Sequence, residues 1–371
     1  MENSVVNNIL STNNKSICAF PWLGAAVRPD GTIIPCCKFM HNRDFGNVND
    51  ADPRQSNSWN LLKEKMLAGD VVSNCQACYK DENNGLVSLR QESLAHFKPA
   101  DTQVKKLKQL EVSFNNVCNL ACVMCSEEYS TKWQSEKIKH RNFNAKGVTE
   151  HEFDYLSWDL SEVESLKIIG GEPLLSQDKF IELLARFDLS KLNVMIATNN
   201  TVLPNAVLKK MFEQCRKVSY KVSLDGIGPV NDWIRWPSKF SDIENNINTL
   251  EEWWGDSPNI DLQFHTVIGI YNIFHLKDIV DYFLSRPKWK MGWSWLSVPL
   301  WQAINVLPNK HSLVKELEVL GSQYKLTPNP FLISMYRLTD NPQSTWQIAV
   351  EETLRLSKER KIEPVKWKIV L

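Results

Sequence analysis

Between residues 106 and 300, short apolar runs alternate with longer amphipathic stretches. The apolar runs favour strands and lie near residues 108–116, 165–169, 193–198, 217–224, 260–268 and 290–298. The stretches between them, such as 178–187 and 205–212, repeat apolar residues at helical spacing. Strands and helices in alternation predict a parallel sheet with right-handed crossovers, so the expected fold class is α/β.

Several of the predicted strands alternate polar and apolar residues, although parallel strands covered on both faces should be apolar on both. The polar positions are Glu111, Ser113, Asn115, Lys221, Ser223, Asp225, Gln263 and His265. A polar face indicates a wet cavity, and polar groups paired within the core are the alternative. On the first interpretation, the candidates for substrate contacts are Lys221, Asp225 and His265.

Two regions flank these six strand and helix units. A cysteine-rich module is expected over residues 1–100, before a core over 101–305. Residues 306–371 form a helical extension with amphipathic patterns near 310–322 and 343–359. The segment Thr327-Pro-Asn-Pro-Phe between those patterns predicts a loop.

Composition narrows the possible partners. The 371 residues include 43 basic and 43 acidic side chains, which gives no strong signal for nucleic acid. No apolar run is long enough to cross a membrane, and the first residues are polar, so a cytoplasmic protein is expected. In a reducing compartment, clustered cysteines indicate metal ligands rather than disulfides.

The most informative cluster is the C-x3-C-x2-C segment formed by Cys118, Cys122 and Cys125. Three soft thiolates in one short loop suit iron and sulfur. Because a four-iron cluster held by three cysteines keeps one iron open, this pattern indicates catalysis. Half of a structural zinc site, which normally has four ligands, is the alternative.

Further motifs follow the next strand runs. Residues 165–169 end in Gly170-Gly171-Glu172-Pro173, where the glycines allow close approach of a ligand and the carboxylate can bind an ammonium group. A strand-to-helix turn with a capping acid is the alternative. The following runs end in Thr198-Asn199-Asn200 and in Ser223-Leu-Asp-Gly226. Motifs at the carboxyl ends of parallel strands meet at one edge of the sheet, where such folds place their chemistry.

The cysteine triplet with GGEP downstream resembles the radical S-adenosylmethionine (radical SAM) superfamily. This resemblance implies a partial (β/α)6 TIM-like barrel, a 4Fe-4S cluster on the triplet, and SAM bound to its open iron. It also implies that reduction of the cluster cleaves SAM to a 5'-deoxyadenosyl radical. The implied SAM contacts are Met124, Gly170, Gly171, Glu172 and Pro173, then Thr198, Asn199 and Asn200 near the ribose, and Ser223 and Arg235 at the carboxylate. For Arg235, a solvated charge at a helix end is the alternative.

A second set of cysteines lies before the core. Pro29-Asp30-Gly31 predicts a turn that brings Cys18 and Cys36 together, and Cys75 and Cys78 form a C-x2-C pair. This region resembles the SPASM and twitch auxiliary-cluster domains, although most of those follow the core. The resemblance implies an iron-sulfur cluster on Cys18, Cys36, Cys75 and Cys78, with Cys37 spare or an alternate ligand. Structural zinc remains the alternative, and Cys215 is expected to be a small buried hydrophobe.

The resemblance implies a radical SAM enzyme of oxidoreductase or isomerase type that abstracts hydrogen from its substrate. A peptide or protein substrate, undergoing oxidation, cross-linking or epimerisation, is the first expectation. A small metabolite such as an amino sugar, cyclitol or nucleotide is the second, and a non-enzymatic iron-sulfur or zinc scaffold is the third. GGEP and the ribose-side motifs argue against a scaffold. An electron donor such as flavodoxin or ferredoxin is the implied partner.

Overall fold

A computed structural model describes residues 14–40, 45–50, 53–83, 87–95, 106–136, 158–308, 310–338 and 345–363. The polar amino-terminal residues, on which the expectation of no signal peptide rests, lie outside this description. None of the described helices has the length and apolar character needed to cross a membrane.

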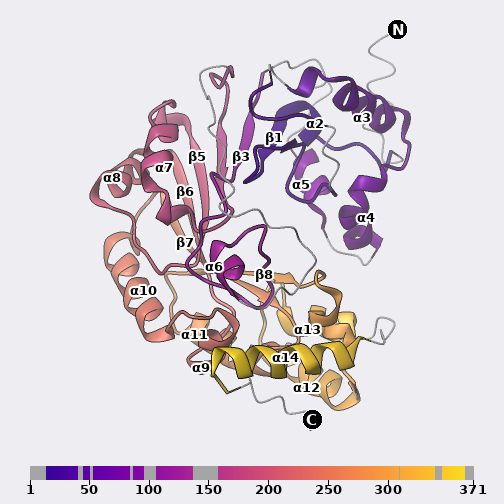
Figure 1. Ribbon diagram of the computed structural model, residues 1–371, viewed down its shortest axis with the longest axis vertical. Coiled ribbons are helices and arrows are strands. Elements are labelled where there is room, and N and C mark those ends of the chain that lie inside the picture. The colour runs from indigo at the N-terminus through magenta and orange to yellow at the C-terminus, as the bar shows by residue number, and fades with distance from the viewer. Residues whose placement is uncertain are drawn as a thin grey trace. The chain divides into compact units, whose positions relative to one another are not determined.

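The described strands form one largely parallel sheet in the order β2-β1-β3-β4-β5-β6-β7-β8 (Figure 1). Their bounds are β1 Gly24–Val27, β2 Ile33–Ile34, β3 Gln109–Val112, β4 Ser165–Ile168, β5 Asn193–Thr198, β6 Lys217–Ser223, β7 Ile260–Ile268 and β8 Lys290–Trp295. The six strands expected from the sequence are confirmed as β3 to β8. The sheet has two further strands, β1 and β2, which come from the cysteine-rich region.

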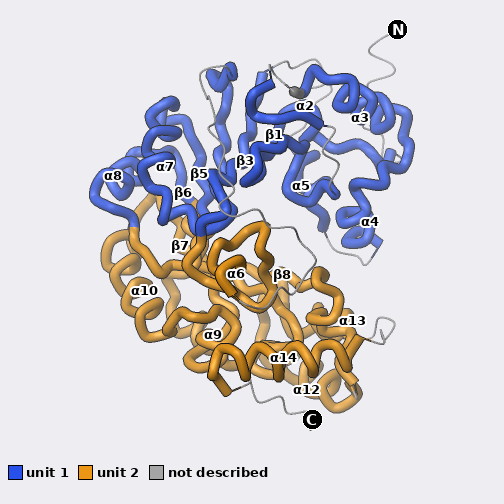
Figure 2. Tube along the Cα trace, viewed as in Figure 1, with its two compact units in different colours: residues 1–117, 144–196, 204–218 blue, residues 118–143, 197–203, 219–371 orange. Residues whose placement is uncertain are grey.

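Helices fill the connections between strands (Figure 1). Their bounds are α2 Phe20–Leu23, α3 Asn57–Ala68, α4 Gln76–Asn83, α5 Leu89–Leu94, α6 Thr131–Ser135, α7 Gln177–Leu184, α8 Ala206–Gln214, α9 Pro229–Ile234, α10 Phe240–Trp254, α11 Leu276–Leu284, α12 His311–Gln323, α13 Pro330–Leu338 and α14 Trp346–Arg360. The chain divides into two compact units, residues 1–117, 144–196 and 204–218 in one and residues 118–143, 197–203 and 219–371 in the other (Figure 2). The division at residues 100 and 305 stays a prediction.

In the first unit, the cysteine-rich region extends the sheet. The turn after β1 leads into β2 in an antiparallel hairpin, as expected, and Arg28 N donates to Thr32 O at 2.9 Å. On its other side, β1 pairs in parallel with β3, which continues in parallel to β4 and β5. Burial alternates along β3 and β4, so that Leu110 and Leu166 are fully buried while Glu111 and Lys167 lie on the partly open face.

In the second unit, β7 and β8 pair in parallel and the three C-terminal helices add to the core. Ile268, Leu317, Phe331 and Leu356 are all buried in that core. The loop expected at residues 327–331 is shorter than predicted, because Pro330 begins α13. Asn329 Oδ1 accepts the Phe331 N–H at 3.1 Å, and proline is compatible with the first helical position because its missing N–H needs no partner there.

Candidate functional site

The loop that carries Cys118, Cys122 and Cys125 is held through its backbone. Ala121 N donates to Trp236 O at 2.7 Å, and Val123 N donates to Ile234 O at 2.9 Å. The carbonyl of Cys122 accepts the indole N–H of Trp133 at 2.8 Å. The cysteine side chains are partly exposed, whereas the backbone around them is fixed. This arrangement presents three partly exposed cysteines on a rigid frame, and Met124 packs partly against the core beneath.

Two polar side chains reach the sulfurs of this loop. Arg235 Nη1 donates to Cys122 Sγ at 3.9 Å, and Asn199 Nδ2 donates to Cys118 Sγ at 3.9 Å. Burial raises the pKa of Cys122, while the charge of Arg235 opposes that effect. Donors and a fixed positive charge beside the sulfurs suit thiolates that carry negative charge when they bind metal.

Arg235 is buried at the end of α9, so the alternative of a solvated helix-end charge is wrong. Its side chain is 11% exposed, and its Nη2 lies 2.6 Å from Asp225 Oδ2. Burial opposes its charge, but Asp225 outweighs that effect and raises the pKa of Arg235. Asp225 itself is fully buried, and its Oδ1 accepts the Val267 N–H at 2.8 Å. This carboxylate is therefore engaged within the protein, and its expected role at the substrate stays a prediction.

The other two candidates for substrate contacts are half-buried on strands. His265 on β7 contacts Ser294 Oγ on β8 through Nε2 at 3.1 Å. Lys221 lies on β6 on the same side of the strand as Ser223, the residue expected at the SAM carboxylate. Their roles stay predictions.

The end of β5 contains a buried polar turn. Thr198 Oγ1 accepts the N–H of Asn200, and Asn246 Nδ2 donates to Asn200 O at 2.8 Å. Asn200 has a φ of 59°, a left-handed conformation that asparagine tolerates better than most residues. Both polar atoms of its side chain are buried without a hydrogen-bond partner among the described residues. Because such groups are costly to leave unpaired, this amide fits a polar ligand group such as a ribose hydroxyl.

The GGEP loop follows β4 and packs closely. Gly170 and Gly171 have φ values of 82° and 49°, and a Cβ on Gly171 would lie 2.4 Å from Val117 O. Glu172 N donates to Val117 O at 2.8 Å, and Glu172 Oε1 accepts the Leu174 N–H at 3.1 Å. Glu172 is therefore a buried capping acid, in agreement with the alternative interpretation of this motif as a strand-to-helix turn. Pro173 begins the short 3-10 helix Pro173–Leu175. A carboxylate has further acceptor capacity, so capping is compatible with binding an ammonium group.

The four expected auxiliary ligands, Cys18, Cys36, Cys75 and Cys78, all belong to the first unit, and their shared site stays a prediction. Cys36 follows β2, while Cys75 ends the 3-10 helix Ser73–Cys75 and Cys78 lies on α4. Burial raises the pKa of Cys18 to about 11 and of Cys75 to about 12. Neighbouring thiols raise these pKa values further: Cys78 acts on Cys18, and both Cys18 and Cys78 act on Cys75.

Two backbone segments bring these ligands together. Met40 N donates to Asn74 O at 2.9 Å, and Asn74 Nδ2 donates to Met40 O at 2.8 Å. These bonds join the loop after Cys36 to the 3-10 helix that ends at Cys75. On the other side, Arg90 donates to Ile17 O at 2.8 Å, which fixes the chain beside Cys18.

The donor sets fit iron-sulfur clusters. Among the described residues, no three Cys, His, Asp or Glu side chains converge on one point as they would around a single ion. Both expected ligand sets consist of cysteine thiols, the soft ligands that bind iron-sulfur clusters, and four thiolates can also bind zinc.

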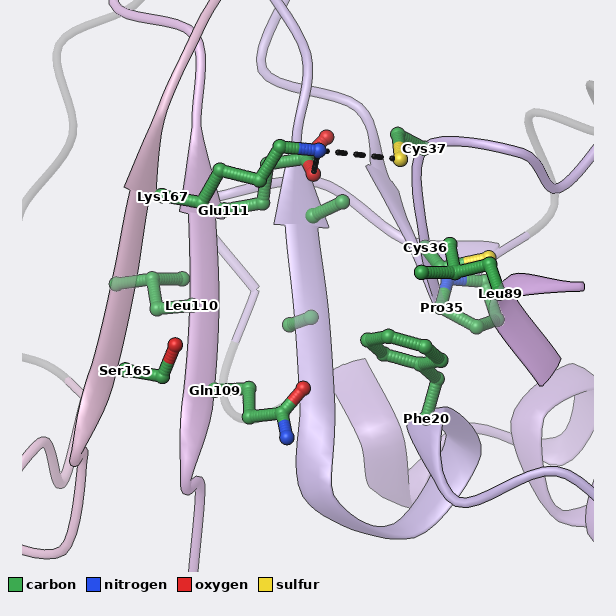
Figure 3. Close-up of a pocket in the computed structure, with 12 residues that line it drawn as sticks. Phe20, Pro35, Cys36, Cys37, Leu89, Gln109, Leu110, Glu111, Ser165 and Lys167 are labelled. Atoms are coloured by element: carbon green, nitrogen blue, oxygen red, sulfur yellow. Dashed lines mark hydrogen bonds and ion pairs between the residues drawn. The ribbon is translucent and has the colours of Figure 1, made fainter. Parts of the chain in front are cut away.

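Cys37 has a different environment from Cys36. Its exposed thiol accepts a hydrogen bond from Lys167 Nζ at 3.3 Å, and Lys167 forms an ion pair with Glu111 at 2.5 Å (Figure 3). These groups border a cavity of about 120 Å³ whose other walls include Phe20 and Leu89. The alternation of polar and apolar residues along β3 placed Glu111 on the polar face of the predicted strand. Nothing in the sequence placed Lys167 beside Cys37, which lies 130 residues away.

Two regions of the chain match models of known families. Residues 112–257 match the radical SAM superfamily, and residues 18–79 match the iron-sulfur cluster-binding domain SPASM. The chain therefore carries a radical SAM region, the type of region that uses S-adenosylmethionine and a 4Fe-4S cluster. A SPASM domain precedes this region and implies a further iron-sulfur cluster.

Several known proteins are similar to parts of the chain. A probable GTP 3',8-cyclase of Methanocaldococcus jannaschii is 26% identical over 181 residues, or 48% of this chain and 55% of that protein. The chain thus spans about half the length of this curated relative. Native anSMEcpe with bound AdoMet is 17% identical, with a TM-score of 0.42 over 60% of this chain and 62% of that one. Streptococcus suis SuiB bound to S-adenosylmethionine is 12% identical, with a TM-score of 0.38 over 73% of this chain and 55% of that one.

Proposed function

We propose that the protein is a radical SAM enzyme that abstracts hydrogen from a residue of a peptide or protein. The observation that carries this proposal is the loop with Cys118, Cys122 and Cys125, whose backbone is held by hydrogen bonds and whose three cysteines are partly exposed. When bound, the cluster on this loop supplies one electron for the reductive cleavage of SAM to a 5'-deoxyadenosyl radical. An external reductant such as flavodoxin or ferredoxin provides that electron.

The remaining residues orient SAM. Glu172 binds its amino group, Arg235 and Ser223 its carboxylate, and Asn199 and Asn200 its ribose. The buried amide of Asn200 and the buried charge of Arg235 support these roles. Both side chains are already held in place, so little conformational entropy is lost when they bind a polar or charged group of the ligand. Asp225 acts as a positioning residue for Arg235.

The cavity beside Cys37 supports a peptide substrate. Its volume of about 120 Å³ is well below the roughly 300–1,000 Å³ of pockets that enclose a whole drug-sized ligand, so it suits a single side chain. Its cation is already paired, since Lys167 is bound to Glu111. A polyphosphate would require several unpaired cations, and this pair does not offer them.

One observation favours a small-molecule substrate. The curated relative is named a probable GTP 3',8-cyclase, and GTP is a nucleotide. To separate the two classes, reduced enzyme and SAM are incubated either with GTP or with synthetic peptides encoded beside the gene. Substrate-dependent release of 5'-deoxyadenosine above the level with SAM alone identifies the class.

The core chemistry has a direct test. Anaerobically reconstituted protein with SAM and dithionite is expected to release 5'-deoxyadenosine, and Cys122→Ala to abolish that release. Cys215→Ala is the matched control, because Cys215 is a buried cysteine at the end of α8 that belongs to neither set of expected ligands. Equal yields from wild type and Cys122→Ala would contradict the proposal.

A further inference from the structure

Arg360, the last residue of α14, reaches the loop that carries the cysteine triplet. Its Nη2 donates to Ala121 O at 2.7 Å, the carbonyl of the peptide that joins Ala121 to Cys122. The side chain is 2% exposed, and its ion partner is Glu136, whose Oε2 lies 3.3 Å from the same nitrogen. A buried cation therefore contacts the cluster loop from a helix 239 residues along the chain.

Two indole rings flank this guanidinium. Its Cζ lies 4.9 Å from the ring of Trp133 and 5.0 Å from the ring of Trp236. Both tryptophans also hold the loop, since Trp133 donates to Cys122 O and Trp236 O accepts from Ala121 N. Arginine stacks on aromatic faces and donates through a planar fork, so a single side chain contacts three parts of this frame.

The helix that carries Arg360 is itself anchored in the second unit. Trp233 Nε1 donates to Ser357 Oγ at 3.1 Å, and Tyr271 OH contacts Thr353 Oγ1 at 3.1 Å. Leu356 is fully buried between these two contacts. The charge of Arg360 is therefore held at a fixed place beside the loop (α14 in Figure 1).

Fixed positive charge near a cluster favours its reduction. One electron from an external donor makes the cluster one unit more negative, and net charge and nearby dipoles are known to set cluster potentials. In a buried site this interaction is screened far less than in water.

We propose that Arg360 is a positioning residue for the SAM-binding cluster, which fixes the loop around Cys122 and raises the reduction potential of the cluster. This inference rests on the proposed function in that it requires a cluster on Cys118, Cys122 and Cys125. It assigns to the C-terminal helix a direct role in the chemistry of the core.

The test is a redox titration of the full-length reconstituted protein. At each potential the reduced SAM-binding cluster is measured by electron paramagnetic resonance, and its signal is recognised because it changes when SAM is added. Arg360→Met is expected to lower the ratio of reduced to oxidised cluster about tenfold at a fixed potential, which equals 59 mV for one electron. Lys358→Met is the matched control, because it removes one positive charge from an exposed position of the same helix. We expect less than a twofold change for that control.

Glu136→Gln separates the electrostatic role from simple disruption. It removes the negative partner of Arg360, so the ratio is expected to rise, opposite to Arg360→Met. An unchanged potential in Arg360→Met with a full cluster would overturn the inference. If the Arg360→Met protein does not hold a cluster, the result for Glu136→Gln tests the inference instead. A ratio of reduced to oxidised cluster that is unchanged or lowered in Glu136→Gln overturns the inference. Absence of any SAM-responsive cluster in the wild-type protein would instead contradict the proposed function.

Discussion

Asp225 and Arg235 form a buried ion pair whose cation also contacts a cysteine of the triplet. Arg235 Nη2 lies 2.6 Å from Asp225 Oδ2, and Arg235 Nη1 donates to Cys122 Sγ. Asp225 lies just after β6, while its other oxygen accepts the backbone N–H of Val267 on β7. The guanidinium is therefore oriented by two neighbouring strands, which is how a long flexible side chain becomes a rigid part of a binding site.

Asp225→Asn keeps an acceptor for Val267 N–H but leaves Arg235 without its negative partner. Breaking a buried pair in this way typically costs about 3–5 kcal/mol, so we expect a clear loss of thermal stability and weaker SAM binding. Asp261→Asn, which breaks a more exposed strand pair with Lys290, should cost about 1 kcal/mol or less. Equal melting temperatures for the two variants would contradict the positioning role of Asp225.

Glu172→Gln tests the proposed contact with the amino group of SAM. The amide still offers an oxygen to cap Leu174 N–H, so the loop should fold while the charge is lost. Losing a charge-assisted contact in a desolvated site costs about 2 kcal/mol, or about thirtyfold in SAM affinity by equilibrium binding. Visible absorption of the cluster should be unchanged. Asp178→Asn, at an exposed position on α7, should bind SAM normally, and normal binding by Glu172→Gln would mean that Glu172 only caps the turn.

Replacing Cys118, Cys122 and Cys125 together by alanine should halve the bound iron. About four irons should remain if Cys18, Cys36, Cys75 and Cys78 hold a cubane. Metal analysis of the purified, reconstituted variant measures this directly. Stoichiometric zinc with no residual iron would reassign the amino-terminal site as structural zinc.

Cys36→Ala and Cys37→Ala form a matched pair of adjacent substitutions. Cys37 is exposed and accepts a hydrogen bond from Lys167, whereas Cys36 is half-buried and is one of the four expected ligands. We expect Cys36→Ala to lose the iron of the amino-terminal site and Cys37→Ala to keep it. Iron retained by Cys36→Ala and lost by Cys37→Ala would exchange their roles.

Local patterns in the sequence were sufficient for most of the sheet. Strand β7 begins and ends where the alternation from residue 260 to 268 predicts, because strict alternation has one structural interpretation. Strand β1 has only the four residues Gly-Ala-Ala-Val, and its parallel pairing with β3 depends on residues 85 positions away, which no local pattern encodes. Helix α13 was not predicted from the sequence, because its first residue, Pro330, is equally typical of a loop.

Side-chain partnerships were harder to predict than strands. The motif at Asp225 marked the end of a strand correctly, but which charge this carboxylate would meet depended on the fold of α9. Arg360 lies just beyond the amphipathic pattern near 343–359, and nothing in the sequence singled it out. Its burial follows from a carbonyl and two indole rings that lie far away in the sequence.

The reciprocal bonds between Met40 and Asn74 bear on the order of assembly of the amino-terminal site. They join the chain near Cys36 to the chain near Cys75 through hydrogen bonds between protein groups, so these bonds offset part of the entropy cost of closing that segment. The metal ligands do not have to offset that cost alone. A larger share of the free energy of metal binding then goes into retaining the metal, in contrast to small domains that must fold around it.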